Sequence, residues 1–589
     1  MAPEAGQARA SRRDRVALGL FGALWVLPFL QPVHLKPFMH FEAEWLAASI
    51  GLLAAALALS RGGHRVPRHV WFLPCSAFWI ALQPVVVDWA YPGSVVLPVA
   101  ALLWALLLYL GLGALTQRLG RESVFSAMAM WILAGAVLAA LVALLQVRGV
   151  PEWASGLVWS DGNPRGTRIL PSGNIRHRGH LSIQLAFGVL AACWLHAHGA
   201  LSRRFAYPAV LLLVAVLVLT TQRAAFAYLL VIPLALLLAY GENALLRRRF
   251  LALSLCALAG LFALQDVAPR IVHGSSQGKV STLARVQNDP DATGAGVRLP
   301  LYRTAWEMFA QAPLTGAGGD TFSARHHARE HASSGYLYTT HAHNQLLHLL
   351  SSFGLLGSVP ALLFVAFGLR RLWSMRALAG AGLAAGGLAI LGLACLIELP
   401  LSFAYFLAPF VLLLAAGATG DDTTTPGQCP QMLPPLLVAG IATCLLLAAH
   451  GYVSMVAPWL KPMSRQAMIG RFDAARGNPF VGPLADSVLE DMIELDRRAI
   501  ALKLEMNARV MAWRPGQRTL WRRSALLALD GRPDEADRAF DLATHAFPRG
   551  RNAFVGHLCS GPRLEQAALR ELVGRAAARS SFPVPDACN

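Results

Sequence analysis

Apolar stretches of about 20 residues recur along the chain and are separated by shorter polar connections. A helix needs about 20 apolar residues to cross the hydrocarbon core of a bilayer, so this pattern predicts membrane-spanning helices. We expect thirteen of them, give or take one, and therefore an all-α polytopic membrane protein. The predicted spans are residues 16–35, 43–60, 69–88, 95–116, 124–147, 179–198, 206–220, 223–241, 249–266, 343–369, 377–397, 400–418 and 434–457.

The apolar stretch 206–241 is too long for a single span, and it is interrupted by the polar letters TTQR. A single helix of that length would greatly exceed the hydrocarbon thickness. The pattern therefore predicts two short helices joined by a turn between Thr220 and Ala224.

Arginines gather in alternate connections, which indicates the sidedness of the chain. Six successive segments on one side, the N-terminal segment included, carry two or three arginines each, although the loop 419–433 on that side has no basic residue. The short turns on the other side carry only Lys36 and Arg223. Positively charged short loops stay in the cytoplasm, so the N-terminus is predicted inside. An odd number of spans then places three segments outside, namely the connections 148–178 and 267–342 and a soluble tail. We expect a transmembrane domain over 1–458 and a soluble helical domain over 459–589.

The composition, with 55% hydrophobic and only 14% charged residues, excludes a soluble cytosolic enzyme. The net charge of +18 lies partly in the inner connections, so it reflects topology and predicts no nucleic-acid partner. Of the eight cysteines, Cys559 and Cys588 share the outer tail. Whether these two form a disulfide is left open by the sequence.

The outer tail carries apolar positions at helical spacing and a Gly-Arg-Pro turn between two helices. This hairpin, RTLWRRSALLALDGRPDEADRAFDLATHAFPR, resembles a tetratricopeptide repeat. Its predicted packing positions are Trp521, Leu526, Ala536, Ala539, Phe540 and Ala543. One such hairpin cannot bury its own apolar face, so it must pack on neighbouring helices or on the membrane domain. It is either a stabilising appendage or a platform for a protein acceptor.

The connection 267–342, of about 75 residues, is far longer than ordinary loops, which suggests a function of its own. Six of the eighteen histidines fall between His326 and His348. The connection ends on TTHAHNQLLHLL, where polar side chains meet the start of the next apolar helix. These side chains are His341, His343, Asn344 and His348.

The earlier histidines of this connection, His326, His327 and His331, are predicted to lie on the surface. The chain has no HExxH motif and no accompanying cysteine pair, so we expect no metal site. His341 and His343 differ because they adjoin an apolar helix, where burial and a nearby guanidinium keep an imidazole neutral. A neutral imidazole can act as a general base.

Three arginines are candidates for binding anionic oxygen atoms. Arg223 follows the TTQ turn at the boundary of two spans, where a charge usually has a partner, although a snorkelling side chain is the alternative. Arg298 and Arg303 lie in GVRLPLYRTAWEMF, a predicted amphipathic helix, which is followed by LTGAGGDTF. Glycines of this kind permit close approach of the backbone to a ligand, but their spacing is not that of a nucleotide-binding motif.

Several motifs together carry a family resemblance. TTQRAA, LYRTAW followed by PLTGAG, and AHNQLLHLLSSFGLLG resemble the O-antigen ligase and polymerase superfamily. Within it, PSGNIRHRGHLS at 171–182 and the helical tail resemble the bacterial protein O-oligosaccharyltransferases of the PglL type. The resemblance covers residues from about 160 to 550.

The resemblance implies a glycosyltransferase of the bacterial inner membrane, with its active site and C-terminal domain in the periplasm. It implies that a preassembled glycan is transferred from undecaprenyl pyrophosphate to Ser or Thr hydroxyls of a periplasmic protein such as a pilin. Neither a metal nor another cofactor is expected. The implied catalytic residues are His343, His341 and Asn344, and the implied pyrophosphate-binding residues are Arg223, Arg298 and Arg303.

One stretch departs from the family pattern. Where the protein-glycosylating enzymes usually show Gln-Pro-Asn, this chain has His177, Arg178 and Gly179. The acceptor therefore stays open, with ligation to lipid A core or glycan polymerisation as alternatives and a lipid-linked glycan transporter as a more distant one. Candidates for positioning donor or acceptor are His177, Arg178, His180 and His348, with Tyr405 and Glu398 as further wall residues. We also predict that Arg223 and His343 are close in space.

Overall fold

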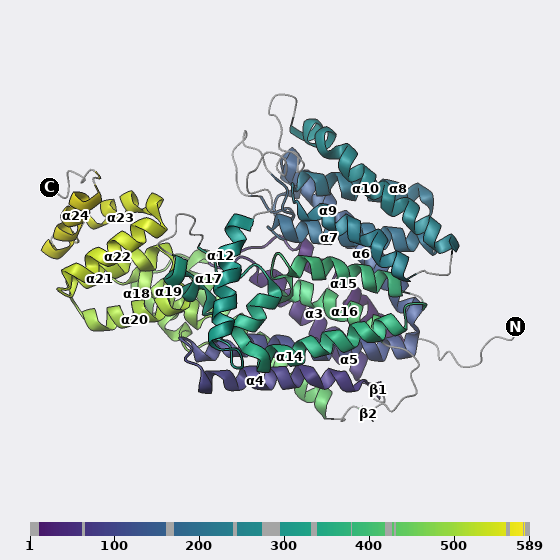
Figure 1. Ribbon diagram of the computed structural model, residues 1–589, viewed down its shortest axis with the longest axis horizontal. Helices are drawn as coiled ribbons and strands as arrows, with labels where there is room; N and C mark the ends of the chain where they lie inside the picture. Colours follow the sequence, from purple (N-terminus) through teal and green to yellow (C-terminus); the bar gives the residue numbers. More distant parts are fainter. Residues whose placement is uncertain are drawn as a thin grey trace. The chain divides into compact units, whose positions relative to one another are not determined.

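The fold is known for most of the chain. The computed structural model describes residues 11–61, 65–160, 170–239, 244–273, 295–330, 338–378, 380–418, 427–428, 432–560, 563, 566–580 and 582. Within these ranges the protein is helical (Figure 1), apart from one short antiparallel pair between β1 (Arg65–Val66) and β2 (Gly427–Gln428). Two residues singled out from the sequence, His331 and Cys588, lie outside the described residues. Cys559 is disulfide-bonded.

The chain forms two compact units. The first comprises Met1–Ala77, Ala100–Gly294 and Val359–Leu446, and the second comprises Phe78–Val99, Ala295–Ser358 and Leu447–Asn589. The helices up to the long connection are α1 (Arg12–Ala23), α2 (Leu27–Leu30), α3 (Phe41–Leu59), α4 (Phe72–Val86), α5 (Val96–Leu119), α6 (Arg121–Arg148), α7 (Arg178–Ala197), α8 (Arg203–Leu219), α9 (Ala224–Ala239) and α10 (Ala244–His273). Those that follow are α12 (Ala295–Gln311), α13 (Phe322–Glu330), α14 (Gln345–Ser374), α15 (Ala381–Cys395), α16 (Ala404–Ala418), α17 (Leu433–Leu460), α18 (Arg465–Ala475), α19 (Gly482–Met492), α20 (Ile500–Trp513), α21 (Gln517–Leu529), α22 (Pro533–Ala546), α23 (Arg551–Leu558) and α24 (Ala567–Ser580). Short 3₁₀ helices are η1 (Arg68–Trp71), η2 (Pro92–Val95), η3 (Glu152–Ala154), η4 (Pro400–Ser402) and η5 (Pro548–Gly550).

Membrane-spanning helices are prominent among these elements. Seven helices in the described residues are long and apolar enough to cross a membrane, and three shorter apolar helices lie at 224–235, 381–395 and 404–418. The predicted turn near Thr220 is confirmed, because α8 ends at Leu219 and α9 begins at Ala224. The count of thirteen spans stays a prediction.

The predicted first span, 16–35, is wrong as a single helix. The first helix ends at Ala23, and the four-residue α2 follows after a turn. Pro28 stands at the start of α2, where it has no N–H group to continue the hydrogen-bond ladder of α1.

The first unit is built around α7, whose apolar length is buried throughout. It packs against α6, α8, α9, α10 and α15. Gly188 permits this close approach, because a Cβ added there would collide with the side chain of Ala136 on α6. The start of α7, which carries the predicted site residues of this unit, is therefore held by the packing of the whole unit.

In the second unit α14 is interrupted at Gly354, whose φ of 62° lies in the left-handed region. The turn 313–318 between α12 and α13 fills this break. Ala317 and Gly318 donate backbone hydrogen bonds to the carbonyls of Ser351 and Ser352, at 2.9 and 3.0 Å. In the opposite direction, Leu355 and Leu356 donate to the carbonyls of Pro313 and Leu314, at 2.8 and 3.1 Å.

The glycines of LTGAGGDTF serve this junction. A Cβ added at Gly316 would collide with backbone atoms of α14 at Ser352, and one added at Gly354 would collide with Leu314. Both residues have positive φ. The sequence suggests that these glycines allow the backbone to approach a ligand. In the structure they allow it to approach the backbone of α14 instead.

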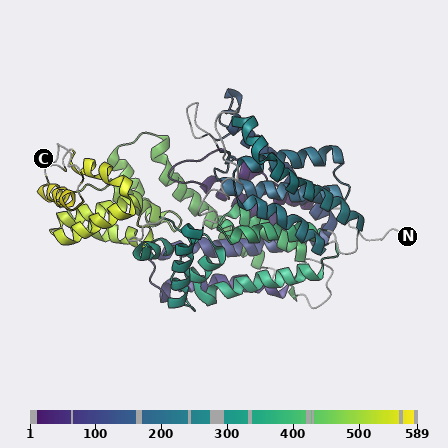
Figure 2. The ribbon, with the colours of Figure 1, turned by 45° about the horizontal axis from the view of Figure 1, so that its top comes forward.

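The tail helices form a separate apolar core in the second unit (yellow-green to yellow in Figure 2). The predicted hairpin is α21 with α22, where Trp521 meets Phe540 with ring centroids 5.0 Å apart. All predicted packing positions are buried except Ala539, which is partly buried. The hairpin covers its apolar face with side chains from α20, α23 and α24.

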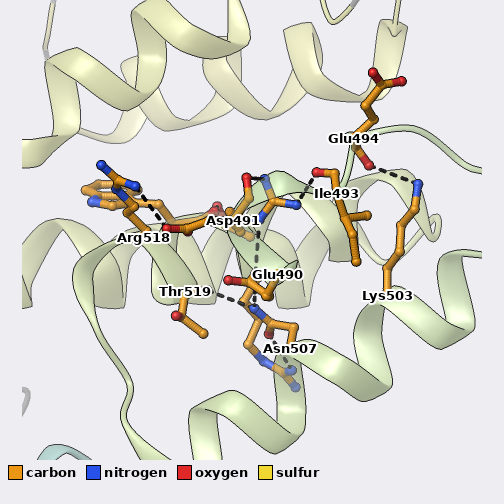
Figure 3. A network of polar contacts seen from close by, with 12 residues as sticks. Glu490, Asp491, Ile493, Glu494, Lys503, Asn507, Arg518 and Thr519 are labelled. Carbon is orange, nitrogen blue, oxygen red and sulfur yellow. Dashed lines mark hydrogen bonds and ion pairs between the residues drawn. The ribbon is translucent and has the colours of Figure 1, made fainter. Parts of the chain in front are cut away.

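A buried polar network joins α19, α20 and α21 (Figure 3). The Oε1 atom of Glu490 accepts hydrogen bonds from Asn507 and Arg522, each at 3.0 Å. Asn507 also donates to the carbonyl of Thr519 at 3.0 Å. Glu490 and Arg522 are 2% and 8% exposed, so this ion pair is desolvated.

Candidate functional sites

The end of the long connection is held firmly before α14 begins. Ala342 is fully buried in a cluster with Leu301, Ala305 and Met308 of α12 and Phe322 of α13. Residues 341 and 343 flank this anchor and are only half-buried. The two imidazoles of interest therefore sit on a fixed piece of backbone while remaining accessible.

His341 and His343 form a pair with ring centroids 4.2 Å apart. His343 has a left-handed backbone, with φ at 50°, and its N–H donates to Nδ1 of His341 at 3.3 Å. An Nδ1 atom that accepts a hydrogen bond leaves the proton of a neutral imidazole on Nε2. His341 is therefore suited to donate a hydrogen bond through Nε2, which leaves His343 as the stronger candidate for a base.

Asn344 is the N-cap of α14, since its Oδ1 accepts from the N–H of Leu347 at 3.0 Å. His348 lies one turn later, against Phe322, with ring centroids 5.9 Å apart. Asn344 thus fixes the start of the helix. The Nδ1 atom of His348 is buried without a hydrogen bond among the described residues.

The two arginines of α12 lie on different faces. Arg298 is half-buried and precedes Tyr302 by one turn, and the hydroxyl of Tyr302 reaches the carbonyl of His343 at 3.5 Å. Arg303 is exposed, on the side of α12 that carries Trp306. Helical spacing therefore brings Arg298, rather than Arg303, toward the histidine segment.

The prediction that His326 and His327 lie on the surface is wrong. They are 1% and 5% exposed. His326 pairs with the hydroxyl of Thr304 at 3.0 Å and stacks on Phe322, with ring centroids 5.8 Å apart. The polar sequence ARHHARE belongs to an amphipathic helix, α13, and the inner face of this helix packs on α12.

The first unit gathers a second group of the predicted residues at the start of α7. His177 is the N-cap, and its Nδ1 accepts from the N–H of His180 at 3.2 Å. Arg178 reaches the hydroxyl of Thr221 at 3.5 Å. Thr221, with φ at 55°, belongs to the turn that carries Arg223. The start of α7 therefore contacts a turn that lies more than forty positions later in the sequence.

His180, in the first turn of α7, is buried. Its Nδ1 pairs with the hydroxyl of Tyr405 at 3.0 Å, and its ring packs on Phe403 with centroids 4.7 Å apart. Tyr405 is 0% exposed, so it supports His180 from the interior and does not line an open wall. Glu398, the other predicted wall residue, is half-buried after the end of α15.

Several residues near the start of α7 were missed by sequence reasoning. Asn174 is buried and donates to the carbonyls of Leu30 and Leu157, at 2.6 and 2.9 Å. The guanidinium of Arg176 stacks on Trp159 at 4.4 Å. An asparagine and an arginine inside a glycine-containing turn were visible signals, but only the fold shows what they contact.

His40, at the entrance to α3, was also missed. Its ring lies 6.0 Å from that of His180. Burial, followed by the nearby His177, His34 and Arg176, lowers the pKa of His40 to about 4. His40 is therefore neutral at pH 7, and its protonation on acidification opposes folding as the pH falls from 6.5 toward 4.

The predicted residues thus fall into two groups. The turn with Arg223 and the start of α7 belong to the first unit, and the segment 338–348 with Arg298 and Arg303 belongs to the second. The closeness of Arg223 to His343 stays a prediction.

Apolar helices of membrane-spanning length, with histidine and arginine side chains gathered near their ends, define a polytopic helical membrane protein. Residues 208–362 match the family model described as O-Antigen ligase, and residues 383–557 match the one described as Virulence factor membrane-bound polymerase, C-terminal. Over 437 residues the chain is 26% identical to the General O-oligosaccharyltransferase of Acinetobacter baylyi, covering 72% of each protein. These matches support the predicted resemblance to the O-antigen ligase and polymerase superfamily, and within it to the PglL-type protein O-oligosaccharyltransferases.

Proposed function

We propose that this protein transfers a preassembled oligosaccharide from undecaprenyl pyrophosphate to Ser or Thr hydroxyls of periplasmic proteins. The family-model matches and the similarity to a general O-oligosaccharyltransferase support an enzyme of the glycosyltransferase type that transfers lipid-linked glycans. The observation that carries the assignment is the anchored pair of His341 and His343 at the start of an apolar helix. A base held beside a membrane helix suits a reaction between a lipid-borne donor and a water-borne acceptor.

In the proposed reaction the acceptor hydroxyl attacks the anomeric carbon of the donor glycan. The bond between that carbon and the pyrophosphate oxygen breaks, and undecaprenyl pyrophosphate leaves with the bonding electrons. His343 takes the hydroxyl proton, an effect worth about 10² to 10⁴ in rate. His341 donates a hydrogen bond that orients the reacting groups, and Asn344 holds the start of α14 in place.

The leaving pyrophosphate gains negative charge, which guanidinium groups stabilise. We assign this role to Arg298 and Arg223, with Arg303 as a weaker third, and we propose that the transfer needs no metal ion. Arg298 lies on the face of α12 next to Tyr302, whereas Arg303 is exposed. The two arginines on one helix therefore provide a matched comparison.

We expect Arg298→Gln to lower the transfer rate about 10²- to 10³-fold, the usual cost of losing one stabilising donor. Arg303→Gln, which removes the same charge from the same helix, is expected to cost less than tenfold. Rates would be measured with a lipid-linked donor and purified acceptor. Equal effects of the two changes would contradict the assigned faces of α12.

The group at the start of α7 is assigned to positioning the donor or acceptor. His177 and Arg178 replace the less basic glutamine and proline of the family pattern, so we infer a more anionic carrier or glycan at this point, and His180 belongs to the same group. His348 is assigned a supporting part beside the catalytic pair. The domain division at 458, the inner-membrane location and the periplasmic side of the site also belong to this proposal.

The match to the O-antigen ligase model favours a second candidate function, the joining of glycan to lipid A core. Cells with and without the gene distinguish the two. We expect O-linked glycopeptides of periplasmic proteins, a pilin for example, to disappear from mass spectra while lipopolysaccharide gels stay unchanged. Loss of long-chain lipopolysaccharide with intact glycopeptides would instead identify an O-antigen ligase.

A further inference from the structure

The outward face of α12 and the turn that follows it are unusually apolar. Leu299, Trp306 and Leu314 are 47%, 56% and 58% exposed. On the opposite face of the helix, Leu301 and Met308 are buried against α13. The exposed Arg303 lies beside this apolar stripe. Tryptophan and leucine with an adjacent arginine are typical of a helix that lies in a membrane interface.

The turn 313–318 is attached to two helices of membrane-spanning length, α4 and α14 (Figure 1). Beyond the backbone bonds to α14, Nε2 of Gln83 on α4 donates to the carbonyls of Thr315 and Ser352, at 2.6 and 2.7 Å. Trp79 on α4 donates to the carbonyl of Phe353 at 3.2 Å. The turn is therefore held at a defined position along the length of each helix.

The distance of the turn from the basic ends of these two helices can be compared with the thickness of a bilayer. Gly354 precedes Arg370, at the basic end of α14, by 16 residues, which is ~24 Å of helix. Gln83 follows Arg68, at the basic end of the other span, by 15 residues, or ~22 Å. A hydrocarbon core is about 30 Å thick, so both helices place the turn inside its edge.

The exposed surface of both helices around this turn is also apolar. On α4 the exposed side chains include Phe78 and Val85, at 67% and 83%, and on α14 they include Leu356, at 45%. The N–H of Leu356 bonds to the carbonyl of Leu314, which makes the stripe on α12 continuous with this exposed apolar surface. Non-helical backbone is tolerated at such a depth only where its polar groups are satisfied. Here the carbonyls of residues 313–315 and the N–H groups of residues 317 and 318 are bonded to α14 or to Gln83.

We propose that α12 and the turn 313–318 are seated in the bilayer interface, at the end of the spans opposite Arg68 and Arg370. Leu299, Trp306 and Leu314 contact phospholipid, and Arg303 meets the lipid phosphates. This part of the connection 267–342 is then a re-entrant membrane element instead of a water-exposed loop. It holds Arg298 and the histidine segment at the level of the lipid headgroups.

The test places photoreactive benzoylphenylalanine at position 306 or 314 of the full-length protein in liposomes of labelled phospholipid without any polyprenyl donor. The matched control is position 325, where Arg325 is exposed on α13. We expect at least ten times more labelled lipid crosslinked at 306 and 314 than at 325. Crosslinking at 306 and 314 no greater than at 325 would overturn the proposal. Position 299, on the same face, supplies a further site if one variant does not fold.

Discussion

At the scale of single residues, the buried pair of Glu490 and Arg522 is the feature with the largest expected effect on stability. Removal of one partner leaves the other charge buried and uncompensated. We expect Glu490→Ala to lower the free energy of unfolding by about 3–5 kcal/mol. Glu494→Ala is the matched control, because Glu494 is 63% exposed and its ion pair with Arg465 is worth about 0–1 kcal/mol. Denaturant unfolding of the purified protein measures both, and similar small losses would contradict the account.

The same carboxyl predicts a dependence on pH. Burial raises the pKa of Glu490 above its ordinary 4.5, in spite of the adjacent Arg522. The folded protein then binds this proton more tightly than the unfolded chain, so its contribution to stability is complete below pH 4.5 and is lost as the pH rises through the folded pKa. Unfolding measured across pH is expected to lose this decline in Glu490→Gln. An unchanged pH profile in that variant would assign the decline to other groups.

The histidines show how far single residues could be assigned from the sequence. His341 and His343 were found because they adjoin an apolar run, and the structure shows them as an anchored pair. His326 was misassigned because its immediate neighbours are polar, whereas its burial depends on Thr304 and Phe322, which the fold supplies. His40 gave no signal, since its contact with His180 joins positions far apart in the chain.

At the scale of elements, the junction between the turn 313–318 and α14 depends on glycine. Gly354 combines a positive φ with a Cβ position already occupied by Leu314. We expect Gly354→Ala to destabilise the protein by about 1–3 kcal/mol from backbone strain alone, and by more where the collision is not relieved. Thermal unfolding in detergent measures the loss.

The control for that change is Gly392→Ala in α15, where an added Cβ would meet nothing within 4 Å. Alanine in a helix interior is favoured over glycine by about 0.5–1 kcal/mol, so this variant is expected to be neutral or slightly more stable. If the two variants melted alike, the role given to Gly354 would be wrong.

Elements were predicted well where apolar length decides them. The boundaries around TTQR, and most of the apolar helices, follow from length and periodicity. The break in α14 could not be predicted, because it is stabilised by hydrogen bonds from a turn about forty residues earlier. The split of the first apolar stretch into α1 and α2 has a local signal in the sequence, because Pro28 has no N–H group to continue a helix.

At the scale of the whole molecule, sidedness follows from the distribution of arginines. A reporter enzyme that is active only outside the cytoplasm, fused after Lys461, is expected to be active in cells. The same reporter fused after Arg118, at a predicted inner connection, is expected to be inactive, because basic short loops stay inside. Activity at both positions, or only after Arg118, would refute the predicted topology.

At this scale the sequence predicts the class of protein, but it does not predict distances between residues of the two units. Motif order and the family resemblance, supported by the matched models over 208–362 and 383–557, indicated the class of protein. The predicted approach of Arg223 to His343 concerns residues in different units, and neither helical periodicity nor loop length fixes such a distance.

The most direct test of the account is glycan transfer by His343→Asn, from a lipid-linked donor to a purified pilin-like acceptor. Asparagine tolerates the left-handed backbone of this position, so the change removes the base while retaining the fold. His557→Ala is the control, because the side chain of His557 is exposed on α23. We predict that His343→Asn transfers about 10²- to 10⁴-fold more slowly, with donor binding retained and the control unchanged. Transfer by His343→Asn at the wild-type rate would contradict the assignment of His343 as the catalytic base.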